Sequence, residues 1–165
     1  MEEIIQNIQN RLVANVPALK YIDQDWGQMD FYPNHPVKYP CALIDIQSAQ
    51  YTDIGRLIQE GVATVVINIY DLRLSNSSQA APQTQKDNAM KIWALVKEIN
   101  KAIHGQNILN DHGIPMRQRM RRTKRNDGIY LTELIYTIQF TDDSCQPQTS
   151  PITATPTIHT VGLLR

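Results

Sequence analysis

The most regular pattern of apolar positions lies in residues 61–71 (GVATVVINIYD), the longest run of β-branched and aromatic residues in the chain. Such a run predicts a central β-strand. With a period of two, its expected core face consists of Ala63, Val65, Ile67 and Ile69. The opposite face consists of Val62, Thr64, Val66, Asn68 and Tyr70. This second face is too apolar to be wholly exposed to solvent, so we expect another segment of the chain or a neighbouring subunit to cover part of it.

Two helices are predicted from apolar residues at helical spacing. The first covers residues 2–15, where the apolar positions follow an acidic first turn and Pro17 ends the helix. The second covers residues 84–103, with Gly105 placed as a C-terminal cap. Trp93 belongs to the apolar stripe of this second helix, so we expect it in the core.

Further strands are predicted on the N-terminal side of the central strand. Residues 41–47 (CALIDIQ) alternate after Pro40 and indicate a second strand, and residues 19–25 could add a short edge strand. Gly and Pro residues mark a loop over residues 26–39. The pattern breaks at Thr52, Asp53 and Gly55, so we expect a long antiparallel connection between residues 48 and 60, although residues 56–59 could extend the central strand backwards.

A β-hairpin closes the predicted domain, and two loop lengths compete for its turn. A two-residue turn would place arginines on the core face without partners. We therefore predict a three-residue loop, residues 126–128, with Gly128 left-handed beside a bulge. In this register the facing pairs are Met120 with Leu134, Met116 with Ile138, Ile114 with Phe140, Arg121 with Glu133, Arg119 with Ile135, and Arg117 with Thr137.

The order of elements predicts an α+β fold. We expect a mostly antiparallel sheet of four to five strands, two helices packed on one face, and a long C-terminal β-hairpin. Residues 1–143 form the single predicted domain, and residues 144–165 form a Thr/Pro-rich C-terminal arm.

Composition narrows the functional classes. The 165 residues contain 16 Lys and Arg against 16 Asp and Glu, so no overall field attracts nucleic acid or an anionic membrane. Cys41 and Cys145 lie far apart, which suits a reduced compartment better than a disulfide scaffold but leaves a disulfide between them open. The N-terminus lacks a signal-peptide pattern, and no apolar run reaches the length of a membrane span, so we expect a soluble, cytoplasmic protein.

Chemical motifs give little support for an enzyme. The chain has no Gly-rich phosphate loop, paired-Cys motif, nucleophile elbow or metalloprotease motif. His104, Asp111 and His112 are close in sequence, but they lack the spacing of known metal sites. Asp142 and Asp143 follow a strand, where turn residues are commoner than catalytic pairs. We therefore predict no catalytic residue, no cofactor and no metal.

The strongest local signal is residues 116–125 (MRQRMRRTKR), where six of ten positions are basic. The segment could contact phosphates, form a solvated face that prevents edge aggregation, or meet carboxylates across a subunit interface. We favour the interface because no aromatic residues interleave the basic ones for base stacking. The candidate contact residues are Arg117, Arg119, Arg121, Arg122, Arg125 and, from the loop, Trp26.

The order and texture of several segments resemble the tail-terminator, or tail-completion, proteins of long-tailed bacteriophages, with the lambda-type terminator fold. The matching segments are IIQNIQNRLV, YPCALIDI, EGVATVVINIYD, AMKIWALVKEINKAIHG and DGIYLTELIYTIQFTD. Together they span residues 2–143, although none is a diagnostic motif. The long connection over residues 48–60 and the Thr/Pro-rich tail depart from the plainest members.

This resemblance implies a minor tail protein of a phage or prophage virion. It implies a non-enzymatic homo-oligomeric ring, usually hexameric, that caps the tail tube and joins it to the head connector. The implied partners are the tail-tube protein and the head-tail connector protein, with DNA crossing the lumen without specific binding and with no membrane involved. The expected location is the virion, assembled in the bacterial host cytoplasm. The alternative is a nucleic-acid-binding module that uses the basic hairpin.

Overall fold

The computed structural model describes residues 1–31, 34, 36–72, 74–109 and 113–147. The elements in chain order are α1 (Glu2–Asn15), β1 (Tyr21–Gln24), the 3-10 helix η1 (Gln28–Asp30), β2 (Cys41–Gly55), β3 (Ile58–Leu72), α2 (Gln83–Ile103), β4 (Met116–Lys124) and β5 (Ile129–Asp142). Both helices begin and end within one residue of the sequence prediction. The described part of the arm stops at residue 147, so most of the predicted arm lies outside the described residues.

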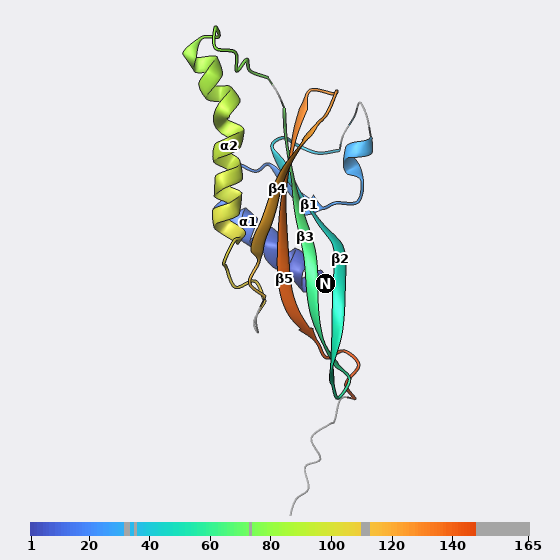
Figure 1. Ribbon diagram of the computed structural model, residues 1–165. Helices are drawn as coiled ribbons and strands as arrows, with labels where there is room; N and C mark the ends of the chain where they lie inside the picture. The colour runs from blue at the N-terminus through green and yellow to red at the C-terminus, as the bar shows by residue number, and fades with distance from the viewer. Residues whose placement is uncertain (32–33, 35, 73, 110–112, 148–165) are drawn as a thin grey trace, which may run out of the picture.

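The strands form one five-stranded sheet in the order β1-β2-β3-β5-β4 (Figure 1). β1 runs parallel to β2, and the other three pairings are antiparallel, so the sheet is mixed. β3 occupies the centre, where its apolar sequence placed it, and β1 is the short edge strand. The α+β class with two helices is confirmed.

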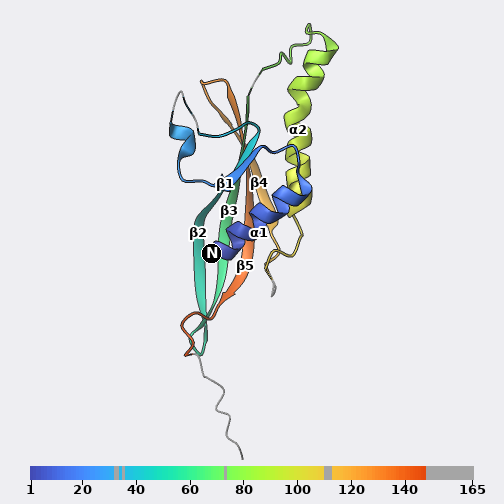
Figure 2. The same cartoon turned by 180° about the vertical axis from the view of Figure 1, so that it is seen from behind.

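The helices and one sheet face enclose the main core. Ile4, Ile8 and Leu12 of α1 and Ile92, Val96 and Ile99 of α2 pack with the β3 residues Ala63, Val65, Ile67 and Ile69, which are fully buried. Figure 2 shows α1 crossing the sheet obliquely, with α2 to one side. The core face predicted for the central strand is therefore correct.

The opposite sheet face has a smaller core at one end. Met29, Val37 and Tyr39 from the connection between β1 and β2 pack with Tyr70 of β3 and with neighbouring apolar residues of the sheet. Burial raises the pKa of the Tyr39 hydroxyl to about 12. A segment of the same chain thus covers part of the second face, as its apolar content required.

The connection predicted between residues 48 and 60 is antiparallel, as expected, but paired strands occupy nearly all of it. β2 and β3 both continue into this region and meet at a tight turn, with Gly55 paired with Ile58. The turn residues Arg56 and Leu57 have φ of 56° and 62°, as the two-residue hairpin turn type I′ requires. The sequence does not indicate this turn, because arginine and leucine rarely adopt positive φ.

The terminal hairpin has the predicted loop but only part of the predicted register. Gly128 is left-handed with φ of 78°, and Met120, Arg121 and Arg119 face Leu134, Glu133 and Ile135 as expected. A register shift between Arg117 and Arg119 then places Arg117 opposite Tyr136, not Thr137. The same shift places Met116 opposite Thr137, not Ile138. The bulged residue is Gln118, whose amide donates to Thr137 Oγ1 at 2.9 Å.

Candidate interaction surface

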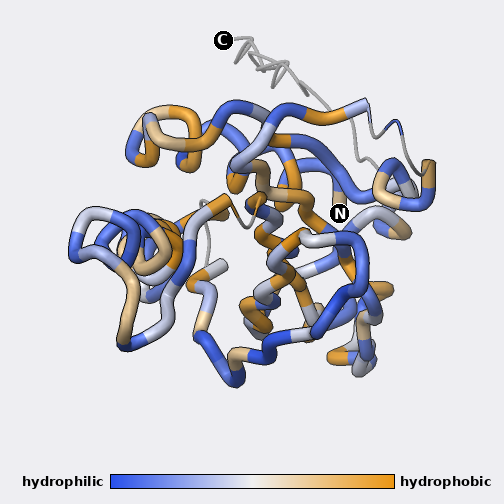
Figure 3. The backbone as a smooth tube through the Cα atoms, turned by 90° about the horizontal axis from the view of Figure 1, so that it is seen from above, coloured by the Kyte–Doolittle hydropathy of each residue, from blue (hydrophilic) through white to orange (hydrophobic). Residues whose placement is uncertain are grey.

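The basic strand β4 is an edge of the sheet and is almost wholly exposed. Eight of its nine residues are exposed, and only Thr123 is partly buried. The prediction that Met116 and Met120 face the core is wrong. Met120 does stand opposite buried Leu134, but 45% of Met120 and 47% of Met116 are accessible, so neither side chain belongs to the core. Figure 3, seen from above, shows α2 standing at one side of the sheet.

Three of the five candidate arginines have partners within the chain. Arg121 donates to Glu133 Oε2 at 2.6 Å, and the Arg122 guanidinium lies 4.4 Å from the ring centre of Tyr130. Arg125 binds Asp127 Oδ2 through two nitrogens, at 2.9 and 2.6 Å. The hydrogen bond from Arg125 holds the pKa of the Asp127 carboxyl below its usual value. These three side chains help to fix the hairpin.

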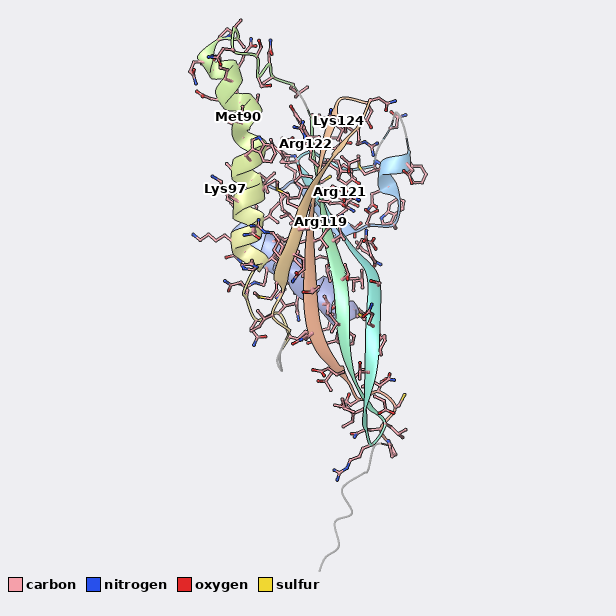
Figure 4. All side chains as sticks on the ribbon, in the orientation of Figure 1. Met90, Lys97, Arg119, Arg121, Arg122 and Lys124 are labelled. Carbon is pink, nitrogen blue, oxygen red and sulfur yellow. The ribbon has the colours of Figure 1, made fainter. Side chains whose placement is uncertain are left out.

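Arg117 and Arg119 have no such partners. Within the described residues, neither guanidinium makes a hydrogen bond or an ion pair, and the same holds for the ammonium groups of Lys124 and Lys97. Figure 4 shows Arg119, Arg121, Arg122 and Lys124 spaced along β4, with Lys97 on the neighbouring helix α2. We call Arg117, Arg119 and Lys124 the free cations of β4.

An open groove of about 650 Å³ lies between α2 and β4. Its apolar part comes from Trp93, Val96 and Met120, and its charged rim comes from Lys97, Arg117 and Arg119. Trp93 was expected in the core but is 36% exposed, because it faces this groove from the helix margin. The groove therefore combines apolar surface with positive charge that no acidic side chain in the described part of the chain neutralises.

Trp26 lies on the opposite side of the sheet, beside β1. It is 55% exposed, its indole Nε1 donates to Asp23 Oδ2 at 3.3 Å, and its ring makes an edge contact with Phe31 at 5.7 Å between centres. Phe31 is exposed as well. Trp26 and the arginines, grouped as one candidate set by the sequence, thus occupy two different edges.

Sequence reasoning missed an acidic region at this second edge. Asp23 of β1 and Asp25 of the following turn are near neighbours in sequence, whereas Asp45 belongs to β2, so only strand pairing brings Asp45 to the same edge. The Asp25 carboxylate accepts from Asn68 Nδ2 at 2.9 Å and from the Gly27 backbone N–H at 3.1 Å. Burial, and to a lesser extent the nearby charge of Asp25, raises the pKa of Asp45.

The remaining sequence candidates take structural roles. His104 Nδ1 accepts from the Arg117 backbone N–H at 3.0 Å, and Asp142 accepts from the Ser144 N–H in a turn. Asp111 and His112 lie outside the described residues. Among the residues that are described, no three His, Cys, Asp or Glu side chains are placed to hold a metal ion. Across the same residues, no helix has the length and apolar character needed to cross a membrane.

Comparison with solved structures gives distant likenesses, of which one is described below. No family model matches the chain, and no curated protein matches it. A solved structure described as "Virion of native gene transfer agent (GTA) particle" contains a chain with 12% sequence identity and a TM-score of 0.47. The match covers 80% of this chain and 90% of that chain. At this distance the likeness does not assign the chain to a family.

Proposed function

We propose that this protein is a structural component of a phage or prophage virion that works as an oligomeric ring. In this role it caps the tail tube and joins it to the head connector without catalysis. The observation that carries the proposal is the β4 surface, where Lys97, Arg117 and Arg119 border a partly apolar groove at an open sheet edge. The order of the sequence segments, which resembles tail terminators, gives the proposal its particular form.

A surface of this kind gains from a protein partner. Trp93 and Met120 expose apolar area that burial would stabilise by about 25 cal/mol per Å². Arg117 and Arg119 offer guanidinium groups that can bind carboxylates in a bidentate way, whereas exposed charge pairs within one chain contribute little. Assembly would supply both contacts, and exposed arginine with aromatic and Met side chains is typical of interface centres.

The test is the solution mass of the full chain with and without the β4 cations. We expect the wild-type protein to form a closed oligomer and the double variant Arg117→Ser/Arg119→Ser to dissociate at concentrations where the wild type stays assembled. Lys91→Ser is the matched control, since Lys91 is an exposed cation of α2 that does not line the groove. Equal masses for the wild type and the β4 variant would contradict the role of this surface.

The proposed partners require a second experiment. The tail-tube protein should bind the preformed oligomer at one end of the tube, and the connector protein should bind the opposite side of the ring. Electron microscopy of tubes mixed with the oligomer would show capped ends. Tubes that remain uncapped, although the oligomer is intact, would contradict the terminator role while leaving ring formation in place.

A second candidate function is nucleic-acid binding by the β4 hairpin. It is favoured by the free cations of β4 and by Lys97, which together present four unneutralised positive charges. Titration of duplex DNA at low and moderate salt tests this candidate. Affinity that falls steeply with salt and is lost in Arg117→Ser/Arg119→Ser would support it, and absence of binding at low salt would eliminate it.

A further inference from the structure

The two edges of the sheet carry opposite charge. Residues 116–125 of the β4 edge contain six basic residues and no acid. Residues 20–45, which include β1, its connection and the start of β2, contain four acids, Asp23, Asp25, Asp30 and Asp45, against two bases, Lys20 and Lys38. Because β1 and β4 are the two outer strands, these charges lie at opposite ends of one sheet.

The strand register places the opposite charges at the two ends of the same cross-strand rows. One row across the sheet runs from Asp45 through Val66 and Ile135 to Arg119. Val66 and Ile135 lie on the sheet face away from the helices, and alternation places Asp45 and Arg119 on that face too, although Arg119, as an edge residue, also borders the groove beside α2. The row begins with a carboxylate and ends with a guanidinium.

The next row on the same face repeats this arrangement. It runs from Asp23 through Leu43, Asn68 and Glu133 to Arg121. Arg121 already binds Glu133, but half of its side chain is accessible, and a guanidinium has five N–H donors. Two successive rows therefore end in an acid at one edge and in an arginine at the other.

We propose that the β4 edge of one copy of this chain docks against the acidic β1/β2 edge of the next copy, with Arg119 meeting Asp45 and Arg121 meeting Asp23. The inference rests on the proposed ring and names the surfaces that form it. The occupant of the β4 edge is thus a second copy of the same protein, selected because its acidic edge complements the charge of β4 row by row.

This contact is heterologous, because the two surfaces that meet are different. Repeated contacts of this kind generate a ring if the rotation closes and a filament if it does not. Sheet twist turns strand directions by roughly 90° over four steps, so the edges meet through side chains and not as one continued backbone ladder.

Two features of the acidic edge favour this docking. Asp45 is partly buried and also feels the negative charge of Asp25, and both effects raise its pKa, so an arriving guanidinium would stabilise its carboxylate. The exposed pair Trp26 and Phe31 supplies rigid aromatic area beside the carboxylates. Aromatic and arginine side chains together are the groups that dominate interface energies.

Charge exchange tests the contact in the full chain. Arg119→Glu and Asp45→Lys should each weaken self-association about tenfold or more, because each places like charges together. An equimolar mixture of the two variants should assemble again, since each altered edge then finds an altered partner of opposite charge. Lys91→Glu is the control and should assemble as the wild type does. A mixture that self-associates no more strongly than either variant alone would overturn the proposal.

Disulfide trapping gives an independent readout that does not depend on charge reversal. Arg119→Cys combined with Asp45→Cys, in a Cys145→Ser background, should form a ladder of cross-linked species under mild oxidant. Each single-cysteine variant should give no ladder beyond the monomer, because a heterologous contact does not bring two copies of residue 119 or of residue 45 together.

The outcomes separate this inference from the proposed function. A wild type that forms a ring, with no ladder from the cysteine pair, would overturn the edge assignment but keep the ring. A wild type that remains monomeric at all concentrations would overturn both. Dimers trapped by Arg119→Cys alone would show that β4 meets β4, which overturns the heterologous contact and leaves self-association standing.

Discussion

Arg121 and Glu133 face each other on β4 and β5, and the Arg121 Nε–H donates to Glu133 Oε2 at 2.6 Å. Glu133 is only 5% exposed, and the Thr123 hydroxyl donates to its other oxygen at 2.7 Å. A buried carboxylate is thus satisfied by two residues of an otherwise exposed strand. This pair holds β4, the proposed docking edge, against β5.

Removal of the Arg121 charge should therefore lower stability. We expect Arg121→Met to lower the free energy of unfolding by about 2 kcal/mol, because the buried Glu133 carboxylate loses its cation and a charged hydrogen bond. Chemical denaturation at low protein concentration measures this. Arg119→Met is the matched control and should change stability by less than about 0.5 kcal/mol, since the Arg119 guanidinium has no hydrogen-bond or ion-pair partner among the residues that the structure describes. Equal losses in the two variants would contradict the account of the hairpin.

Gly61 allows Phe140 to lie across the backbone of the central strand. The two residues are paired, and a Cβ at position 61 would come within 2.2 Å of the Phe140 ring. We expect Gly61→Ala to cost about 1–3 kcal/mol through overpacking. In a Phe140→Leu background the same change should cost clearly less, because the smaller side chain can move aside. Additive costs, measured by thermal unfolding of all four proteins, would show that the ring does not cause the penalty.

The β2–β3 turn holds two non-glycine residues at positive φ, Arg56 and Leu57. Each such residue costs about 1 kcal/mol or more. Replacement by the preferred pair, Arg56→Asn with Leu57→Gly, should therefore raise the free energy of unfolding by about 1–2 kcal/mol. Leu57 is also 60% exposed, so the change removes no core contact. A loss of stability in denaturant titration would argue that the turn has another backbone conformation.

The two cysteines should differ strongly in reactivity. Cys41 is buried, and burial raises the pKa of its thiol to about 12, whereas Cys145 is exposed. A thiol reagent at pH 8 should therefore modify one thiol rapidly in the native protein and the second only after unfolding. Mass spectrometry should place the rapid label on Cys145. Rapid labelling of Cys41 would contradict its position in the smaller core.

Several parts of the fold could be predicted because local pattern and tertiary packing agree. The four residues Ala63, Val65, Ile67 and Ile69 alternate in sequence, and the helices cover that face. The loop of the terminal hairpin followed from Gly128 and from the cost of burying arginines. In each case one physical requirement excluded the alternatives.

Other parts could not be predicted because their causes are not local. The bulge at Gln118 shifts Arg117 and Met116 by one position, and no residue type there signals a bulge. Trp93 fits a helical stripe, but its exposure depends on where the sheet ends beneath α2. The acidic edge escapes a linear search for charge runs, since strand pairing alone brings Asp23 and Asp45 to one side.

The most direct test of the central claim is the mass of the wild-type protein in solution, measured by light scattering over a range of concentrations and at two salt concentrations. We expect a closed oligomer of fixed size, and the resemblance to tail terminators implies a hexamer. We also expect weaker assembly at higher salt, because opposite charges on the two sheet edges would hold the copies together. A strictly monomeric protein at high concentration and low salt would contradict self-assembly through these edges.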